Sequence, residues 1–216
     1  MRQVECWIKG VTHPAVIPMF LALIVASYLL WDQPLAWKIH DLALTQHYPV
    51  ITWVTQLGKS LYWVAVLPLF ALFFRHGHRI KQMEWRIWFL WITLVIANGS
   101  CFVLKTLLGR ARPELLFSDH IFGFFGYTTN SLYHSFPSGH VTQVTTAVLS
   151  LSLLYSKQRW LFLSIGTLIL ATRILLTKHY LSDVLATVLL VCLEYKLFLD
   201  IVAQQCPLYW KKLGVK

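Results

Sequence analysis

His179 and Asp183 are the pair in this sequence whose types and spacing most favour chemistry. They lie four residues apart, so on a helix both side chains share one face and the carboxylate can hydrogen-bond to one imidazole nitrogen. Such a bond fixes the tautomer and leaves the other nitrogen free to act as a base or a nucleophile. The alternative for this segment is a histidine at a membrane interface, followed by an aspartate that caps a helix.

A second candidate element is the stretch Pro137-Ser138-Gly139-His140, which stands just before an apolar run. It predicts a turn that opens a helix, and the free backbone N–H groups of a helix start bind anions. Ser138 can add a hydroxyl donor, Gly139 lets a ligand approach the backbone closely, and His140 would stand beside the bound anion. The simpler interpretation is a helix N-terminus with Ser138 as its cap.

Three permanent cations could complete an anion site. Lys105 and Arg112 are seven residues apart, so a helix that continued to Arg112 would carry both on one face, while Arg110 would point elsewhere. Taken alone, these two residues are more simply explained as anchors at a membrane interface. Arg173 ends an apolar run, where a guanidinium group is costly unless it faces a polar cavity.

Together these residues match the requirements of phosphoryl transfer. That reaction needs positive charge on the phosphate oxygens, a nucleophile and a proton for the leaving group. The cations and the helix start would supply the charge, and the two histidines would supply the nucleophile and the proton. The other nearby carboxylates are not spaced like a divalent-cation site, so we expect no metal and no other cofactor; they are Asp32, Asp41, Glu114 and Asp119.

The composition indicates that a membrane holds these residues. Of 216 residues, 57% are hydrophobic and 13% are charged, whereas soluble domains average about 45–50% and about 25%. A transmembrane helix needs about 20 mostly apolar residues. The chain shows no linker and no repeat, so residues 1–216 are expected to form one all-α integral membrane bundle of six transmembrane helices, with approximate spans 14–31, 60–75, 86–105, 141–156, 160–177 and 181–203.

The lysine and arginine residues of the loops predict the orientation, because cytoplasmic loops carry an excess of them. The excess falls on the side of the two termini, which we therefore expect in the cytoplasm. The basic residues on this side are Arg2, Lys9, Arg75, Arg79, Lys81, Arg86, Lys157, Arg159, Lys211, Lys212 and Lys216. The active site would then lie at the extracytoplasmic ends of helices 3 to 6. This distribution explains the net charge of +10 without a nucleic-acid partner.

The residues above resemble the signature of the type-2 phosphatidic acid phosphatase superfamily, which reads K-x6-R-P, P-S-G-H and S-R-x5-H-x3-D. The order and the internal spacing are the same here, and Thr172 keeps a hydroxyl where the family has serine. The six expected spans are also those of the family's membrane branch. The matching residues are Lys105…Arg112-Pro113, Pro137-Ser138-Gly139-His140 and Thr172-Arg173…His179…Asp183.

The resemblance implies a role for each matching residue. His179 would attack the phosphorus and form a phosphohistidine, and Asp183 would orient it. His140 would protonate the leaving oxygen. The phosphate would be held by Lys105, Arg112, Ser138, Gly139 and Arg173.

A site at the outer membrane surface favours a lipid phosphate or diphosphate as substrate. We expect a bacterial inner-membrane phosphatase that acts on undecaprenyl diphosphate, phosphatidylglycerophosphate, phosphatidic acid or a lipid A phosphate. Two alternatives remain: a lipid phosphotransferase, and a non-catalytic transporter or scaffold, for which Glu194 in the last apolar segment would be the starting point. The aromatic loop 114–136 is expected to anchor at the interface, with part of it lining the route of an acyl or prenyl chain.

Overall fold

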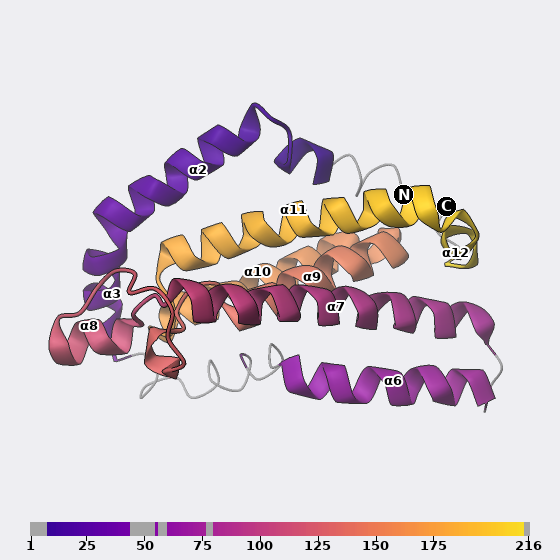
Figure 1. Ribbon diagram of the computed structural model, residues 1–216, viewed down its shortest axis with the longest axis horizontal. Coiled ribbons are helices and arrows are strands. Elements are labelled where there is room, and N and C mark those ends of the chain that lie inside the picture. Colours follow the sequence, from indigo (N-terminus) through magenta and orange to yellow (C-terminus); the bar gives the residue numbers. More distant parts are fainter. Residues whose placement is uncertain (1–7, 44–54, 56–59, 77–79, 214–216) are drawn as a thin grey trace.

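The chain folds into a bundle of helices with irregular connections (Figure 1). The computed structural model describes residues 8–43, 55, 60–76 and 80–213, and this part holds no β-strand beyond an isolated bridge between Arg110 and Phe124. The elements are α2 (Val16–Ala26), the π-helical turn η1 (Ser27–Trp31), α3 (Asp32–Asp41), α6 (Ser60–His76), α7 (Lys81–Leu108), α8 (Pro113–Asp119), η2 (Ser131–Tyr133), α9 (Gly139–Leu154), η3 (Ser156–Gln158), α10 (Arg159–Leu175), α11 (Leu181–Gln205) and α12 (Pro207–Lys212).

Helices cover all six predicted apolar segments, although their ends differ from the prediction. The first segment continues without a break into α3, so the helical stretch runs over Val16–Asp41. This stretch and Lys81–Leu108 are long and apolar enough to cross a membrane, and Trp63–His76 is a shorter apolar helix. Residues 44–54 and 56–59, which belong to the predicted outer connection, lie outside the described residues.

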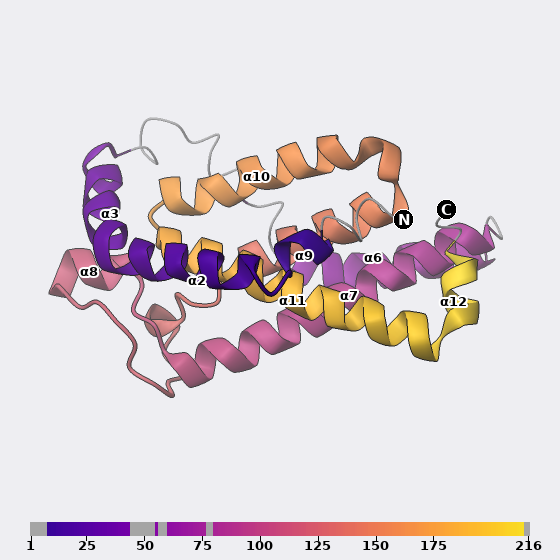
Figure 2. The same cartoon turned by 90° about the horizontal axis from the view of Figure 1, so that it is seen from above.

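The long helices α6, α7, α9, α10 and α11 run along the long axis of the molecule (Figures 1 and 2). The short helices α3 and α8 lie at one end of this bundle and α12 lies at the other. At the α12 end, Ile8 and Leu213 share one core cluster, so the two ends of the described chain meet there. The starts of α9 and α11 and the ends of α7 and α10 lie at the opposite end, beside α8.

Polar and small residues join the helices inside the bundle. The hydroxyl groups of Thr93 in α7 and Ser150 in α9 are 3.0 Å apart. Gly166 in α10 lies so close to α9 that an added methyl group would come 2.6 Å from a Val148 methyl. Within a bilayer the lipid is as apolar as the side chains, so close packing and hydrogen bonds of this kind hold helices together.

Helix α7 ends at Leu108 because Gly109 adopts a left-handed conformation, with φ +52°. The chain then leaves the helix axis and pairs with the next loop, where the Phe125 amide donates to the Gly109 carbonyl at 2.9 Å. A helix that continues to Arg112, which would place Lys105 and Arg112 on one face, is therefore not formed. Lys105 lies in the last turn of α7, whereas Arg112 has extended backbone and directly precedes α8.

Gly109→Ala is expected to destabilise the protein strongly. A Cβ there would lie 1.9 Å from the Gly126 carbonyl oxygen, and the positive φ strains any L-residue. The unfolding temperature of the purified protein in detergent should fall by roughly 5–10 °C. Gly99→Ala is the matched control, since no atom lies within 4 Å of a Cβ at this position of α7. Equal unfolding temperatures for the two variants would contradict this account of the turn.

Candidate active site

The residues predicted to do chemistry meet at the α8 end of the bundle. Lys105 is in the last turn of α7, His140 in the first turn of α9 and Arg173 in the last turn of α10. His179 lies two residues before α11, and Asp183 is in the first turn of that helix. The ends of four helices therefore build one site, which is why residues far apart in the sequence can act together.

His179 is 4% exposed, and a backbone carbonyl holds its ring. Its Nδ1 lies 2.7 Å from the Ser135 carbonyl oxygen. A carbonyl can only accept a hydrogen bond, so Nδ1 carries the proton and Nε2 keeps its lone pair. Asp183 Oδ2 is 3.9 Å from Nδ1, which is too far for a hydrogen bond. The predicted bond from Asp183 to the ring is thus not formed, and Ser135 takes its place.

The surroundings of His179 keep its ring neutral. Burial lowers the pKa of His179 well below its usual value near 6.5, and the positive charges of Arg173, Arg112 and Lys105 lower it further. Desolvation and positive neighbours both disfavour an imidazolium. His179 is therefore unprotonated at neutral pH, and a neutral imidazole has the lone pair that a nucleophile needs.

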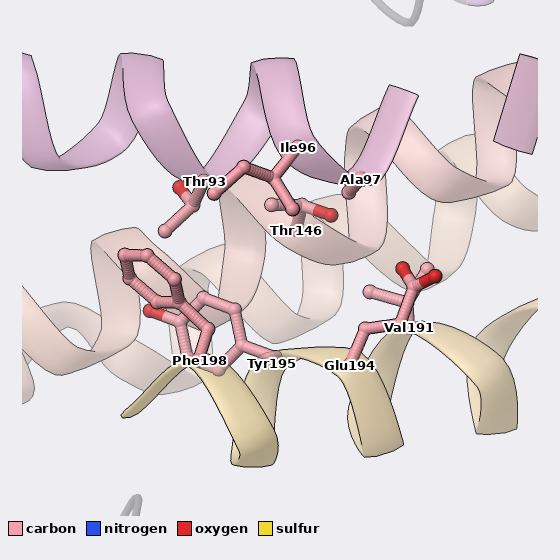
Figure 3. Close-up of a pocket in the computed structure, with 8 residues that line it drawn as sticks. All are labelled: Thr93, Ile96, Ala97, Thr146, Val191, Glu194, Tyr195 and Phe198. Carbon is pink, nitrogen blue, oxygen red and sulfur yellow. The ribbon is translucent and has the colours of Figure 1, made fainter. Parts of the chain in front are cut away.

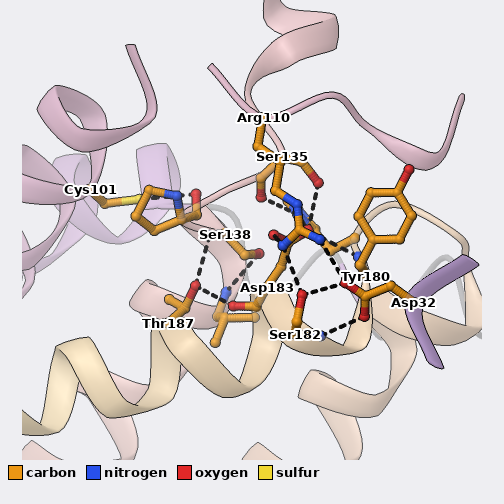
Figure 4. Close-up of polar contacts among 12 residues, drawn as sticks. Asp32, Cys101, Arg110, Ser135, Ser138, Tyr180, Ser182, Asp183 and Thr187 are labelled. Carbon is orange, nitrogen blue, oxygen red and sulfur yellow. Dashed lines mark hydrogen bonds and ion pairs between the residues drawn. The ribbon is translucent and has the colours of Figure 1, made fainter. Parts of the chain in front are cut away.

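Asp183 acts on Ser135 rather than on the histidine ring. Its Oδ2 accepts hydrogen bonds from the Ser135 hydroxyl at 2.6 Å and from the Tyr180 amide at 3.0 Å. Its Oδ1 accepts from Arg110 Nη1 at 2.5 Å (Figure 4). Because Ser135 also supplies the carbonyl that binds His179, the carboxylate positions the ring through Ser135.

Arg110 lies at the centre of a buried ion network that the sequence did not suggest. The residue is 2% exposed, and its Nη2 donates to Asp32 Oδ2 at 2.6 Å. Asp32 also accepts from the Ser182 backbone N–H at 2.9 Å and from the Ser182 hydroxyl. Two carboxylates, Asp32 at the start of α3 and Asp183 in α11, thus share one guanidinium group (Figure 4).

Aromatic rings enclose the same guanidinium group. The Arg110 Cζ lies 4.8–5.7 Å from the ring centroids of Tyr180, Tyr28, Phe124 and Phe122, within the range of cation–π contacts. Phe122 and Phe124 belong to the loop 114–136, which was expected to anchor at the membrane interface. These two rings instead pack on the ion network, although Phe124 is half exposed.

The start of α9 has the helix cap predicted for Ser138. Ser138 caps the helix, since its Oγ accepts from the Val141 amide at 3.4 Å. Its own amide donates to Thr187 Oγ1 at 3.0 Å, which ties this turn to α11. A methyl group added at Gly139 would lie 3.4 Å from Lys105 Nζ. The ammonium group of Lys105 therefore stands next to the helix start, where it can bind the same anion.

Arg112 and Arg173 both keep a buried donor for a ligand. The Nε of each is buried and has no hydrogen-bond partner among the described residues. Arg173 is held in place by Thr55, whose Oγ1 accepts from Nη1 at 2.7 Å. Buried donors without an acceptor are costly, so an anion that accepts from them would bind favourably.

The positive charge at this end of the bundle comes from side chains. Within the part of the chain that the structure describes, no three His, Cys, Asp or Glu residues lie close enough together to hold a metal ion. Thr55 and Ser135, which the sequence did not suggest, hold Arg173 and His179 in place.

Comparisons with known proteins give one matching family and two related enzymes. The PAP2 superfamily model matches residues 86–204. The lipid A 1-phosphatase of Rhizobium johnstonii is 27% identical over 201 residues, which cover 88% of this chain and 81% of that protein. The lipid A 1-phosphatase of Rhizobium etli is 25% identical over 173 residues, which cover 76% and 73%.

A solved structure has a similar fold. It is the crystal structure of the first transmembrane PAP2 type phosphatidylglycerolphosphate phosphatase from Bacillus subtilis. The two chains superimpose with a TM-score of 0.50 at 20% identity, over 94% of this chain and 93% of that chain. At this level of identity the likeness concerns the fold.

Proposed function

This chain belongs to the PAP2 superfamily, and from that premise we propose that it removes a phosphate group from a membrane lipid through a phosphohistidine at position 179. All three motifs noted in the sequence lie within residues 86–204, so family membership confirms the resemblance. One observation carries the proposal. The buried ring of His179 has Nδ1 held by Ser135, which leaves Nε2 as a neutral nucleophile.

The reaction proceeds in two steps. In the first step Nε2 of His179 attacks the phosphorus, the bond from phosphorus to the lipid oxygen breaks, and His140 gives that oxygen a proton. In the second step a water molecule attacks the phosphorus, His140 takes a proton from this water, and the bond from phosphorus to nitrogen breaks. The products are the dephosphorylated lipid and inorganic phosphate.

The phosphate group is held by positive charge and by the start of α9. Arg112 and Arg173 offer their unpaired Nε donors, and Lys105 lies beside Gly139. Ser138 adds its hydroxyl group and the N–H groups of the helix start add further donors. Charge on the phosphate oxygens is thus met by side chains, and we propose that the reaction needs no metal ion.

The proposed topology follows the distribution of charge. Helices α2, α6, α7, α9, α10 and α11 would all cross a bacterial inner membrane, with both termini in the cytoplasm and the site at the extracytoplasmic ends of the last four. The shared cluster of Ile8 and Leu213 supports termini on one side. The position of the catalytic residues at the opposite end supports a site on the other side.

The substrate would be a lipid monophosphate or diphosphate. The names of the Rhizobium relatives favour a lipid A phosphate, and the fold neighbour is a phosphatidylglycerolphosphate phosphatase. Undecaprenyl diphosphate and phosphatidic acid complete the set. A phosphotransferase is the second candidate, because a phosphohistidine can also pass its phosphoryl group to another lipid.

A transporter gains little support from Glu194. Its side chain faces a small pocket between α7, α9 and α11 that is also lined by Thr93, Thr146 and Tyr195 (Figure 3). The cavity measures about 20 Å³, enough for roughly one water molecule. A space of this size can hold one water molecule beside the carboxyl group of Glu194, but it does not form a path for a solute through the bundle.

The test is phosphate release by the purified protein from a panel of these lipids, with His179→Ala as the control. We expect release from at least one lipid without an added acceptor, unchanged activity in EDTA and inhibition by vanadate. Release that requires an acceptor lipid would favour the phosphotransferase. No release from any member of the panel, under either condition, would overturn the proposal.

A further inference from the structure

An apolar cavity of about 250 Å³ lies between α6, α7, α9 and α10, and it reaches the surface of the bundle at the exposed side chains of Trp63 and Ile165. Its lining includes Trp63, Leu94, Gln143, Ala147, Ile165 and Ile169. An apolar cavity of about 150 Å³ is already large enough to stay dry and to take up benzene. The space between these helices is therefore wide enough for part of a hydrocarbon chain.

One polar group of this lining lacks a partner. Gln143 is 2% exposed, and its Oε1 accepts a hydrogen bond from Asn98 Nδ2 at 2.7 Å. Its Nε2 is buried and has no hydrogen-bond partner among the described residues. Unpaired buried donors are rare in folded proteins, which makes this N–H group a candidate contact for a ligand.

The cavity begins one helical turn from the reaction site. Gln143 follows His140 by three residues in α9, and Ile169 precedes Arg173 by four residues in α10. One turn of an α-helix rises about 5.4 Å. A lipid whose phosphate lies beside His140 and Arg173 can therefore place atoms a few bonds from that phosphate next to Gln143.

We propose that this cavity binds an acyl chain of the lipid substrate, and that Gln143 Nε2 donates a hydrogen bond to the carbonyl oxygen of that chain. An acyl group in ester or amide linkage combines an apolar tail with one acceptor near the phosphate. A prenyl chain has no such acceptor. A buried water typically makes about three hydrogen bonds, which a single amide in apolar walls does not offer. The inference rests on the proposed function and narrows its substrate to acylated lipids.

The first test compares two substrates that differ only in the carbonyl group: a diacylglycerol phosphate and the dialkyl ether analogue of the same chain length. Wild-type protein should show a kcat/KM about tenfold or more higher for the diacyl lipid, because the ether leaves the Gln143 donor unpaired. Gln143→Leu should lower kcat/KM for the diacyl lipid by the same factor and leave the ether analogue unchanged. An N-acyl glucosamine 1-phosphate, assayed in parallel, separates amide-linked from ester-linked acyl groups.

Two further variants separate binding from folding. Gln158→Leu, an exposed glutamine in η3, should leave the ratio between diacyl and ether substrates at its wild-type value. Ala147→Phe would fill the cavity and should lower kcat/KM for long-chain substrates about tenfold, while a short water-soluble phosphoester is hydrolysed as before. This variant and the wild-type comparison decide the question even if Gln143→Leu fails to fold.

The outcomes are distinguishable. Equal kcat/KM for the diacyl and ether lipids in the wild-type protein would overturn the role of Gln143 while leaving the phosphatase proposal intact. An equal decrease of kcat/KM for both substrates in Gln143→Leu would also overturn the proposed hydrogen bond, since it would indicate that Gln143 has a structural role. Failure of the wild-type protein to hydrolyse any lipid phosphate would overturn the inference together with the function on which it rests.

Discussion

His179→Ala is expected to lower kcat for lipid phosphate hydrolysis by more than about 1,000-fold and to preserve most of the binding of inorganic phosphate. The variant removes the nitrogen that attacks phosphorus, and loss of a nucleophile removes most of the rate enhancement. Binding survives because the charges of Lys105, Arg112 and Arg173 remain. The measurements are steady-state phosphate release and the binding of inorganic phosphate by the purified protein.

His76→Ala is the matched control for this prediction. His76 is exposed at the end of α6, away from the site, and its replacement should change kcat by less than about twofold. Activity of His179→Ala near the wild-type value would exclude His179 as the nucleophile. Loss of activity together with loss of phosphate binding would indicate a misfolded site, which thermal unfolding detects.

Arg110→Gln is the second change with a large expected effect. It leaves Asp32 and Asp183 buried without their shared cation, and removal of one partner of a buried ion pair costs about 3–5 kcal/mol of stability. We expect a lower unfolding temperature and a lower kcat, because Asp183 holds Ser135 and Ser135 holds His179. The KM should change little, since Arg110 does not belong to the proposed phosphate site.

Two further variants identify the cause of this loss. Asp32→Asn combined with Arg110→Gln removes one of the two buried carboxylate charges that Arg110→Gln leaves unpaired. The double variant should therefore unfold at a higher temperature than Arg110→Gln alone. Glu114→Gln breaks the ion pair between Glu114 and Lys178, whose side chains are 40% and 45% exposed respectively. The loss of this exposed pair should lower the free energy of unfolding by less than about 1 kcal/mol. An unchanged unfolding temperature in Arg110→Gln would show that the network does not stabilise the protein.

The helices, and the residues that we propose as catalytic, could be predicted because their signals are local in the sequence. Long apolar runs predict helices without knowledge of their neighbours, and all six runs are helical. The spacing of His179 and Asp183, and the turn before His140, likewise indicate chemistry from a few adjacent residues. The orientation proposed for the loops likewise uses only the positions of Lys and Arg.

The supports of the site could not be predicted, because they join residues that lie far apart. Asp32 and Arg110 are 78 residues apart, and the sequence offers Arg110 and Arg112 as two similar guanidinium groups. The folded structure alone shows that Arg110 binds the two buried carboxylates. The best available signal was Asp32 itself, a carboxylate placed directly after a long apolar run.

Ser135 illustrates a second limit. Ser135 binds His179 through its backbone carbonyl oxygen. Because every residue has a backbone carbonyl, the residue type cannot indicate this hydrogen bond. The expected bond from Asp183 was chemically reasonable at a spacing of four residues. The observed arrangement keeps the same two residues but inserts Ser135 between them.

The most direct test of the central claim is to identify the residue that carries the phosphoryl group during turnover. The wild-type protein, mixed with a lipid phosphate that it hydrolyses, is quenched at alkaline pH, digested and analysed by mass spectrometry. The account predicts one phosphoryl group on His179, and none in His179→Ala. Release of phosphate at the wild-type rate with the phosphoryl group on another residue, or with no adduct at any time point, would contradict it.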